Sequence, residues 1–343
     1  NTNIESFETS VENYLGDHCF FSALNSGTSA IHLALILLGV EEQDEVICQS
    51  FTFAATAYPI LYQKATPVFV DSELETWNMC PESLREAITH RIQHHKKPKA
   101  IVVVHTYGMP AKMNEIMAIS KEFGIPVLED AAGAFGAMYD GKKCGTIGDF
   151  GVFSFNNNKI MTTFGGGGLV ARDKSQKDLA IFYATQAKDP VSFYKHSKIG
   201  YNYRMSPVAA AIGQHELNDL TLRINNKASI NAYYNNLFNG INGVTLQNNP
   251  NALFRSNFWL SSLLIDADKC TFNNTMLKKQ LSKDNIESRY LWNPLHLQPI
   301  FKNCLYFGGQ VAEELFKKGL SLPSGFMKKN ELERISTSIQ KLL

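Results

Sequence analysis

The run Ala100-Ile101-Val102-Val103-Val104 is apolar at every position. A strand with one buried face alternates apolar and polar residues, so an unbroken apolar run indicates a strand that is covered on both faces. Such strands are typical of a mostly parallel sheet with helices on either side. This stretch therefore predicts an α/β fold.

Similar short apolar runs recur on both sides of this strand. The seven strand candidates are 19–24, 45–49, 66–70, 100–105, 126–130, 150–155 and 168–172. Segments with helical periodicity lie between several of them, at 28–38, 53–62, 81–95 and 112–123. Gly39 and Gly124 follow two of these segments, at the place where glycine commonly ends a helix. The alternation predicts an α/β/α large domain.

The pattern changes after about residue 206. Residues 207–239 have the pattern of one long helix, and the later candidates are strands 258–265 and 286–290 and helices 274–283, 309–318 and 329–341. Mixed short elements of this kind are typical of an α+β domain. We expect a large domain over 1–225 and a smaller C-terminal α+β domain over 226–343.

Composition excludes several classes of function. The 343 residues carry a formal net charge of +1, and no basic stripe of the kind that binds nucleic acid is present. No apolar stretch approaches the roughly 20 residues that cross a bilayer. The polar start, Asn1–Glu5, lacks a signal-peptide core, and it also lacks an initiator Met, so a leading segment is expected to be missing.

Cysteine and histidine spacing argues against a metal site. The six cysteines are scattered without a C-x-x-C pair, which favours reduced thiols in the cytoplasm. No histidines have a metal-binding spacing such as H-E-x-x-H. We therefore expect no metal.

A lysine, a carboxylate and a glycine run form the chemical pattern of the chain. Lys159 closes Phe153-Ser154-Phe155-Asn156-Asn157-Asn158-Lys159, Gly165–Gly168 follows, and Asp130 ends a strand candidate some thirty positions earlier. Pyridoxal phosphate (PLP) needs a lysine for its Schiff base, an acid for its pyridine nitrogen and backbone donors for its phosphate. Together these features suggest a PLP site.

Each feature also has an ordinary structural explanation. Asp130 could cap the next turn, and Lys159 could be an exposed surface lysine. Asn25-Ser26-Gly27-Thr28-Ser29 could bind a phosphate at the start of a helix or could be a plain helix cap. Ser154 could face the phosphate, since its Phe neighbours face the other way. The glycine run could be a hairpin turn.

One segment imitates a nucleotide-binding loop. Gly136–Lys143 has the glycine and lysine spacing of a P-loop, but its last residue is Lys where Ser or Thr is required. No strand leads directly into it. We interpret it as a β-turn between surface strands.

With these residues assembled, the chain resembles the DegT-type nucleotide-sugar aminotransferases, which are PLP enzymes of the aspartate aminotransferase fold (fold type I). The similarity runs over nearly the whole chain. It is carried by Asn25–Ala30, Ser50–Phe53, Val70-Asp71, Glu129–Ala132, Gly148–Gly151, Phe153–Phe155, Lys159, the glycine run, Gly200–Ser206 and Arg289–His296.

A narrower resemblance is to bacterial 4-aminotransferases of the bacillosamine pathway. It rests on Asn156–Thr163, Thr185–Lys188 and Leu322–Gly325. It implies transfer of the amino group of L-glutamate to the C4 ketone of a UDP-linked 4-keto-6-deoxy-N-acetylhexosamine, for a bacterial surface glycan or glycoprotein. The alternatives are a 3-aminotransferase or a dehydratase acting on another nucleotide sugar, and a non-catalytic PLP-binding sensor. Dehydratases of this fold replace the Schiff-base lysine with histidine, and Lys159 argues against that alternative.

The resemblance also implies roles for single residues. Lys159 would form the Schiff base and Asp130 would pair with the pyridine nitrogen, which makes these two the catalytic residues. The implied cofactor-binding residues are Ser26, Gly27, Thr28, Phe53, Asp130, Ser154, Asn156, Lys159 and Asn202. The implied substrate-binding residues are Tyr203, Arg204, Arg289, Trp292 and His296. Asn202 would reach the cofactor of a neighbouring subunit, which implies a homodimer with shared active sites.

Two positions depart from the family pattern. Many relatives carry His or Gln where this chain has Gly133, and many carry His or Tyr where it has Asn156. A contact to the cofactor ring is therefore expected to be absent or to come from another residue.

Overall fold

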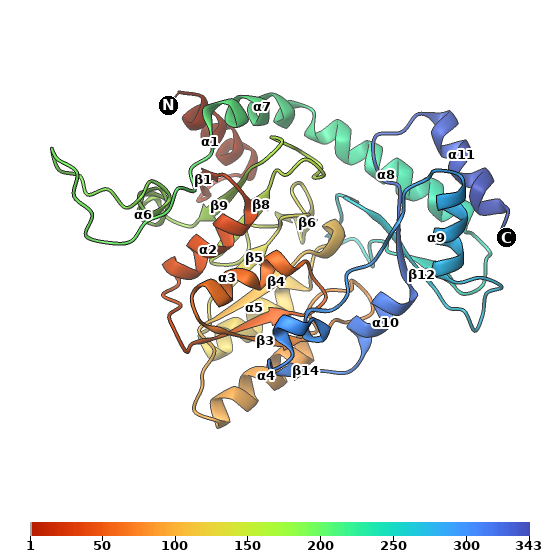
Figure 1. Ribbon diagram of the computed structural model, residues 1–343, viewed down its shortest axis with the longest axis horizontal. Coiled ribbons are helices and arrows are strands. Elements are labelled where there is room, and N and C mark those ends of the chain that lie inside the picture. Colours follow the sequence, from red (N-terminus) through yellow and green to blue (C-terminus); the bar gives the residue numbers. More distant parts are fainter. Residues whose placement is uncertain (1) are drawn as a thin grey trace.

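A computed structural model describes residues 2–343 (Figure 1). Its largest sheet has eight strands in the order β1-β9-β8-β5-β4-β2-β3-β14. In that order, their bounds are Phe20–Leu24, Gly167–Ala171, Phe150–Ser154, Val127–Asp130, Ala100–Val104, Glu45–Gln49, Thr66–Val70 and Tyr306–Phe307. All seven strands predicted from the first half of the chain are confirmed, with ends shifted by at most one residue.

The sheet is mostly parallel, as predicted. The strands from β14 to β8 run parallel to their neighbours, while β9 is antiparallel to β8 and β1 is antiparallel to β9. The carboxyl ends of β5 and β8 therefore lie at the same edge. Ligands bind at this edge in open parallel sheets.

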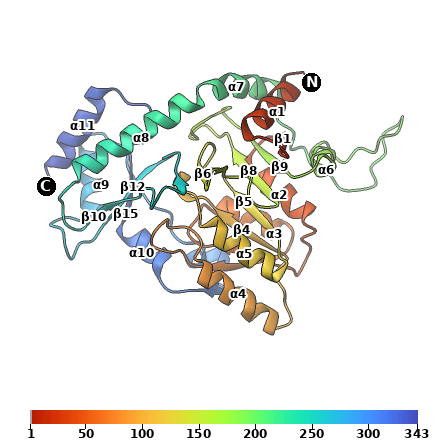
Figure 2. The same cartoon turned by 180° about the vertical axis from the view of Figure 1, so that it is seen from behind.

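Helices cover both faces of the sheet. On one face pack α2 (Gly27–Leu37), α3 (Tyr58–Tyr62) and α6 (Lys174–Ala184); on the other pack α4 (Pro81–Gln93) and α5 (Met113–Phe123), as Figure 2 shows from behind. Val102 packs with the α2 side, while Ile101 and Val103 pack with the α4 side. Each such fully buried side chain contributes about 1.5–3 kcal/mol. The double burial explains why β4 is apolar at every position.

The helices after residue 206 differ from the prediction. The single helix expected over 207–239 is wrong, because α7 (Pro207–Asn218) ends at Asp219 and α8 (Leu220–Leu237) begins there. The amide of Asp219 donates to the carbonyls of Glu216 and Leu217, which is a tighter turn than an α-helix. Figure 1 shows α7 beside α1 (Thr2–Leu15) and α8 leading toward β12 and α11. Neither α1 nor α6 was among the predicted helices.

A four-stranded antiparallel sheet occupies the C-terminal part. Its order is β10-β12-β15-β13, with bounds Val244–Leu246, Ser261–Ile265, Gly319–Leu322 and Arg289–Tyr290. It packs with α9 (Asn274–Lys283) and α11 (Lys329–Gln340), while α10 (Val311–Lys318) leads into β15. Strands β10 and β15 were not predicted. Because β14 comes from this half of the chain and pairs with β3, the boundary at 225/226 stays a prediction.

The segment that imitates a P-loop is a surface hairpin, as interpreted from its sequence. Strands β6 (Met138–Tyr139) and β7 (Lys142–Lys143) pair with each other, and β11 (Phe254–Arg255) pairs with β6. The remaining elements are short 3-10 turns, namely η1 (Ala54–Thr56), η2 (Thr106–Gly108), η3 (Leu295–Leu297) and η4 (Pro299–Phe301). Among residues 2–343, no helix combines the length and the apolar character needed to cross a membrane.

Candidate active site

The carboxyl edge of the large sheet gathers the main predicted site residues. Asp130 is the last residue of β5, and Ser154 is the last residue of β8, its neighbour in the sheet. The turn after β8 leads to Lys159, whose amide donates to the carbonyl of Asn156 at 3.0 Å. The strand order, in which β5 and β8 are neighbours, brings these residues to one edge of the sheet.

The carboxylate of Asp130 is buried and held by two donors. Its Oδ2 accepts from the hydroxyl of Thr56 at 2.7 Å, and its Oδ1 accepts from the amide of Ala132 at 3.1 Å. The Thr52 hydroxyl lies 2.9 Å from that of Thr56 and extends the chain of hydroxyls. The bond to Ala132 is the turn cap considered from the sequence, so Oδ1 of Asp130 caps this turn while Oδ2 bonds to Thr56. The sequence pattern did not point to Thr56.

Lys159 lies in an environment that favours its neutral form. Burial lowers the pKa of its amine to about 8, although the carboxylate of Asp130 acts in the opposite direction. Nζ lies 3.8 Å from the centroid of the Trp259 ring. A solvated surface lysine has neither feature, so the surface alternative does not fit this position.

The backbone at the start of α2 packs closely against β8 and β9, and this segment around Gly27 and Gly167 is called the cradle below. Ser26 caps the helix, since its side chain accepts from the amide of Ser29 at 3.0 Å. A Cβ on Gly27 would lie 3.2 Å from the Cβ of Ser154, and a Cβ on Gly167 would lie 2.4 Å from the amide nitrogen of Gly27. The cap and the phosphate interpretation are therefore compatible. Glycines keep the backbone close, and the first amides of a helix are free to bind an anion.

Aromatic side chains border the site. Phe53 follows β2 and is 60% exposed, so one of its faces is open to a planar ligand. Its ring centroid lies 6.3 Å from that of Trp292, which in turn lies 4.3 Å from Tyr107 and 6.5 Å from Trp259. Sequence reasoning found Phe53 and Trp292, but it missed Tyr107 and Trp259.

Comparison with known proteins assigns the chain to a family. Residues 1–340 match the model of the DegT/DnrJ/EryC1/StrS aminotransferase family. The chain belongs to this family. It is 45% identical over 326 residues to EpsN of Bacillus subtilis (strain 168), a protein provisionally named as a pyridoxal phosphate-dependent aminotransferase, with 94% of this chain and 83% of that protein covered.

Two further similar proteins support the same family assignment. The chain is 36% identical over 305 residues to the GDP-perosamine synthase of Escherichia coli O157:H7, covering 89% of this chain and 80% of the relative. The crystal structure of a DegT DnrJ EryC1 StrS aminotransferase from Brucella abortus superposes with a TM-score of 0.92 at 30% identity, covering 99% and 90% of the two chains. The protein is thus a PLP-dependent sugar aminotransferase of nucleotide-sugar biosynthesis, with the predicted fold.

The residues at the edge of the sheet fit PLP. Gly27 and Gly167 let the backbone at the start of α2 approach Ser154 closely, and free amides at a helix start can bind a phosphate. Asp130 is a buried carboxylate with two neutral donors, so it can also hold a protonated ring nitrogen. Lys159 supplies an amine with a lowered pKa. The individual cofactor-binding roles remain predictions that this geometry supports.

Two of the predicted substrate-binding residues are engaged with other helices. The hydroxyl of Tyr203 lies 3.1 Å from Nδ1 of His32 in α2, and its ring stacks on that of Tyr201. The guanidinium of Arg204 pairs with the Glu8 carboxylate and donates to the carbonyl of Ala23 at 2.9 Å. These contacts tie α1 and α2 to the segment after residue 200. Substrate-binding roles for Tyr203 and Arg204 stay predictions that these contacts do not favour.

Two more of the five predicted substrate-binding residues, His296 and Arg289, lie on separate elements. Nδ1 of His296 is 2.7 Å from the hydroxyl of Ser50 at the end of β2, and its ring stacks on Tyr306 with centroids 3.8 Å apart. Arg289 lies on β13, where its exposed guanidinium bonds to Glu287. His296 is thus near the carboxyl edge of the large sheet, while Arg289 belongs to the smaller sheet.

Asn156 and Asn202 are both exposed. The backbone carbonyl of Asn202 accepts from the side-chain amide of Asn25 at 3.1 Å, next to the cradle of α2. That Asn202 reaches the cofactor of a partner subunit stays a prediction.

A second carboxylate, that of Glu129, holds the loop that leads into β8. It points away from Asp130, since successive residues of a strand face opposite sides. Its oxygens accept from the amides of Gly145 and Gly148 at 2.8 and 2.6 Å, and from Nε2 of His105 at 2.9 Å. Nδ1 of His105 accepts from the amide of Ala111, so Nε2 carries the proton. The Glu129 carboxylate therefore fixes the loop that precedes β8.

We expect Glu129→Gln to lower the free energy of unfolding at pH 7 by about 3 kcal/mol. The substitution removes a buried negative charge and leaves donors that bonded to the carboxylate without an acceptor. Burial alone would raise the pKa of Glu129, but the donors from His105 and the loop amides outweigh it and lower that pKa. A lowered folded pKa contributes stability above the unfolded value of about 4.3, and this is lost as pH falls through the folded pKa.

Urea titrations from pH 7 to pH 3 measure this effect. The gap between wild type and Glu129→Gln should shrink toward low pH. Glu122→Gln, at an exposed glutamate paired with Arg85, is the control and should change stability little, because exposed ion pairs contribute little. Equal losses in the two variants would contradict the role given to Glu129.

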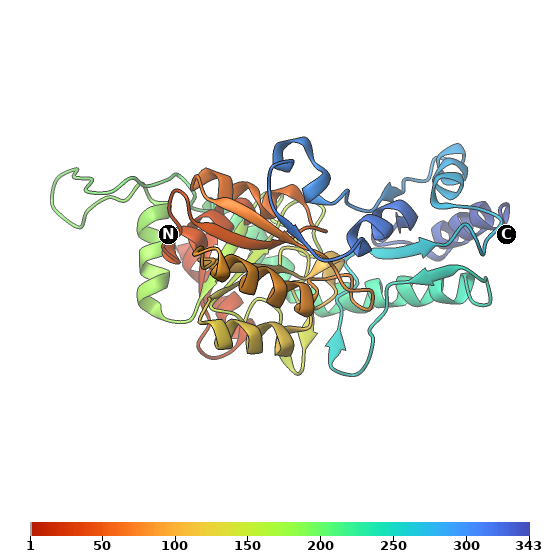
Figure 3. The same cartoon turned by 90° about the horizontal axis from the view of Figure 1, so that it is seen from below.

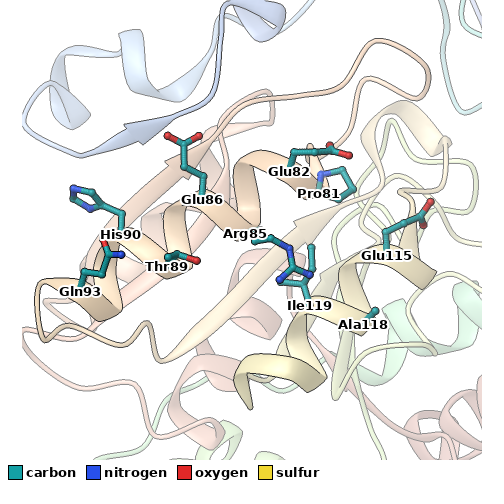
Figure 4. Close-up of a pocket in the computed structure, with 10 residues that line it drawn as sticks. All are labelled: Pro81, Glu82, Arg85, Glu86, Thr89, His90, Gln93, Glu115, Ala118 and Ile119. Atoms are coloured by element: carbon teal, nitrogen blue, oxygen red, sulfur yellow. The ribbon is translucent and has the colours of Figure 1, made fainter.

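A groove of about 730 Å³ lies elsewhere, between α4 and α5 (Figure 4). It is lined by Pro81, Glu82, Arg85, Glu86, Thr89, His90, Gln93, Glu115, Ala118 and Ile119. None of the predicted site residues is among them, and the groove lies on helices that cover the sheet rather than at its carboxyl edge. It plays no part in the chemistry described above.

Proposed function

We propose that the enzyme moves the amino group of L-glutamate to the C4 ketone of a UDP-linked 4-keto-6-deoxy-N-acetylhexosamine. The product would serve a bacterial surface glycan or glycoprotein, and the reaction would take place in the cytoplasm. The observation that carries the aminotransferase chemistry is the pair formed by Lys159 and Asp130 at the carboxyl edge of the sheet. The choice of C4 and of UDP rests on the sequence resemblance at Asn156–Thr163 and Leu322–Gly325.

Asp130 and the α2 cradle would hold the two ends of the cofactor. When bound, PLP stores the amino group and stabilises the negative charge that develops when a neighbouring C–H bond is broken. The Asp130 carboxylate would keep the ring nitrogen protonated, while Thr56 and Ala132 keep that carboxylate in place. The amides near Gly27 and the hydroxyls of Ser26, Thr28 and Ser154 would bind the phosphate. Phe53 would cover one ring face.

Lys159 would move the protons. Its amine, with a pKa of about 8, has a substantial neutral fraction near neutral pH. In that form it can take the proton from the α-carbon of L-glutamate. In the second half of the reaction the same amine delivers a proton to the sugar carbon that gains the amino group. Phe53, which is 60% exposed, and Trp292, whose ring centroid lies 6.3 Å away, would border the path of the sugar.

Product analysis tests the substrate. The enzyme with PLP and L-glutamate is given the UDP-linked 4-keto sugar, a UDP-linked 3-keto sugar and a GDP-linked 4-keto sugar, and the amino sugars are identified by mass spectrometry and NMR. We expect a kcat/KM for the UDP-linked 4-keto sugar at least about tenfold above the others, a gap of about 1.4 kcal/mol. A preference for either competitor would replace the proposed substrate while leaving the aminotransferase chemistry in place.

A GDP-linked sugar is the second candidate. It is favoured by the similarity to the GDP-perosamine synthase of Escherichia coli. The roles proposed for Lys159 and Asp130 do not depend on the nucleotide base, so the two candidates share one mechanism.

We also propose that the enzyme is a homodimer, and one segment supports this. Residues 188–199, called the arm below, extend from the body after α6 (Figure 3). The arm carries Phe193, Tyr194 and Ile199, of which Tyr194 is 83% exposed and Ile199 82%. Several large apolar side chains on one projecting segment are typical of a surface covered by a partner chain.

Light scattering is expected to give twice the chain mass of 38.3 kDa. Tyr194→Ser with Ile199→Ser should raise the dimer dissociation constant by about 100-fold or more, because each buried side chain contributes about 1.5–3 kcal/mol. Leu74→Ser, which removes an exposed apolar side chain outside the arm, is the control and should leave the dimer unchanged. A monomeric wild type would contradict this proposal, and so would a dimer dissociation constant that the arm variants do not change.

A further inference from the structure

Trp259 contacts the loop of residues 155–166, called the lysine loop below, at two points. Nζ of Lys159 lies over the indole ring, 3.8 Å from its centroid, which is a cation–π distance. The indole Nε1 donates to the backbone carbonyl of Asn158 at 2.8 Å. One side chain, a hundred residues away in sequence, therefore holds both the amine of Lys159 and the backbone immediately before it.

The indole occupies space that Gly133 leaves open. A Cβ on Gly133 would lie 2.6 Å from Cε3 and 3.0 Å from Cζ3 of Trp259, closer than real contacts allow. The backbone of Gly133 is not in the left-handed region, so glycine is required here for space and not for conformation. Any larger residue at 133 would displace the indole from Lys159.

The position of Trp259 is fixed from several sides. The Asn257 side chain donates to the carbonyls of Gly133 and Phe135, at 3.0 and 2.9 Å, and accepts from the amide of Trp259. Nζ of Lys227, from α8, donates to the carbonyl of Trp259 at 3.1 Å. Trp259 itself is buried. Such a fixed ring can hold a mobile lysine in one place.

We propose that Trp259 is a positioning residue for Lys159, and that its indole face holds the amine whenever that amine is free. The inference rests on the proposed aminotransferase function, in which Lys159 must act as a free base close to the reacting carbon. Gly133 is the residue that admits the indole. Asp130 is the charged group that acts on the same amine, so both a carboxylate and an aromatic face influence the free lysine.

Two effects of the indole on the amine can be separated. Its bulk excludes water, which favours the neutral amine, while its face attracts the ammonium and favours the charged form. Trp259→Leu keeps apolar bulk but removes the face. Trp259→Phe keeps both an apolar side chain and an aromatic face. A merely structural role for Trp259 would change both variants alike.

The pKa of Lys159 is the deciding measurement. Full-length protein without PLP is labelled with acetic anhydride between pH 6 and pH 11, and the labelled Lys159 peptide is quantified by mass spectrometry. We expect a pKa in Trp259→Leu below that in Trp259→Phe by about 0.5 to 1, from the strength of a partly desolvated cation–π contact. Trp259→Phe should remain close to wild type. Equal values in the two variants would overturn the proposal.

Gly133→Ala gives a second, independent readout. It should shift the labelling pKa of Lys159 in the wild-type background and have little further effect in Trp259→Leu, where the side chain it displaces is absent. Gly165→Ala, in the lysine loop with open space at its Cβ, is the matched control and should have no effect. If Gly133→Ala and Trp259→Leu shift the pKa of Lys159 additively, Gly133 does not act on Lys159 through Trp259, and this part of the proposal is wrong.

These results are distinct from a failure of the proposed function. If wild type fails to transfer an amino group from any donor but the labelling pattern is as expected, the function is wrong and the indole contact stands. If wild type transfers the amino group and the two Trp259 variants label alike, only the inference is wrong.

Discussion

Lys159→Ala is expected to lose at least about 10⁴-fold in turnover, because one side chain supplies both the covalent link to the cofactor and the general base, and general base catalysis alone contributes up to about 10⁴-fold. The loss should appear in both halves of the reaction, since the same amine serves the donor and the sugar. Binding of PLP should persist, because the cradle at Gly27 and the carboxylate of Asp130 are untouched.

Steady-state kinetics with L-glutamate and the keto sugar measure this loss, and equilibrium dialysis measures PLP retention. Lys142→Ala, in the exposed β6–β7 hairpin, is the control and should keep wild-type turnover. Turnover in Lys159→Ala within tenfold of wild type would remove Lys159 from the mechanism.

Asp130→Ala should lower turnover by about 10²–10³-fold, the usual cost of removing one preorganised charge partner from an active site. Without the carboxylate the ring nitrogen is no longer held protonated, so the cofactor stabilises negative charge less well. The hydroxyl of Thr56 would also lose its acceptor. PLP should dissociate more readily as a result.

The kinetic loss and the PLP dissociation constant are measured on the same preparation. Asp149→Asn is the matched control, because Asp149 is a structural carboxylate that accepts from the amide of Val127 at the opposite end of β5. It should affect stability rather than cofactor binding. Wild-type kinetics in Asp130→Ala would contradict the pairing of Asp130 with the ring.

The sequence predicted the strands of the large sheet and its mostly parallel character. The unbroken apolar run of β4 required two covered faces, and parallel neighbours place their carboxyl ends at one edge. Asp130 and Ser154 lie at the same edge because β5 and β8 are neighbours, an order that was not predicted from the sequence. The helical spacing of Ile4, Phe7, Val11 and Leu15, all buried, was a signal that would also have revealed α1.

The contacts that arise only from tertiary packing were not predictable. Nothing near Trp259 in the sequence indicates that it meets Lys159, because the two are a hundred residues apart and no spacing rule joins them. Arg204 carried a charge suited to a substrate, yet Glu8 of α1, a helix that had not been predicted, is its partner. The break at Asp219 was hidden because residues on both sides have helical periodicity.

The visible spectrum of the PLP-loaded protein on addition of L-glutamate tests the central claim most directly. The account predicts that the absorption of the lysine-linked cofactor disappears, that the absorption of the aminated cofactor replaces it, and that one equivalent of 2-oxoglutarate is released per site. A lysine-linked absorption that does not respond to L-glutamate or to any other amino donor would contradict it.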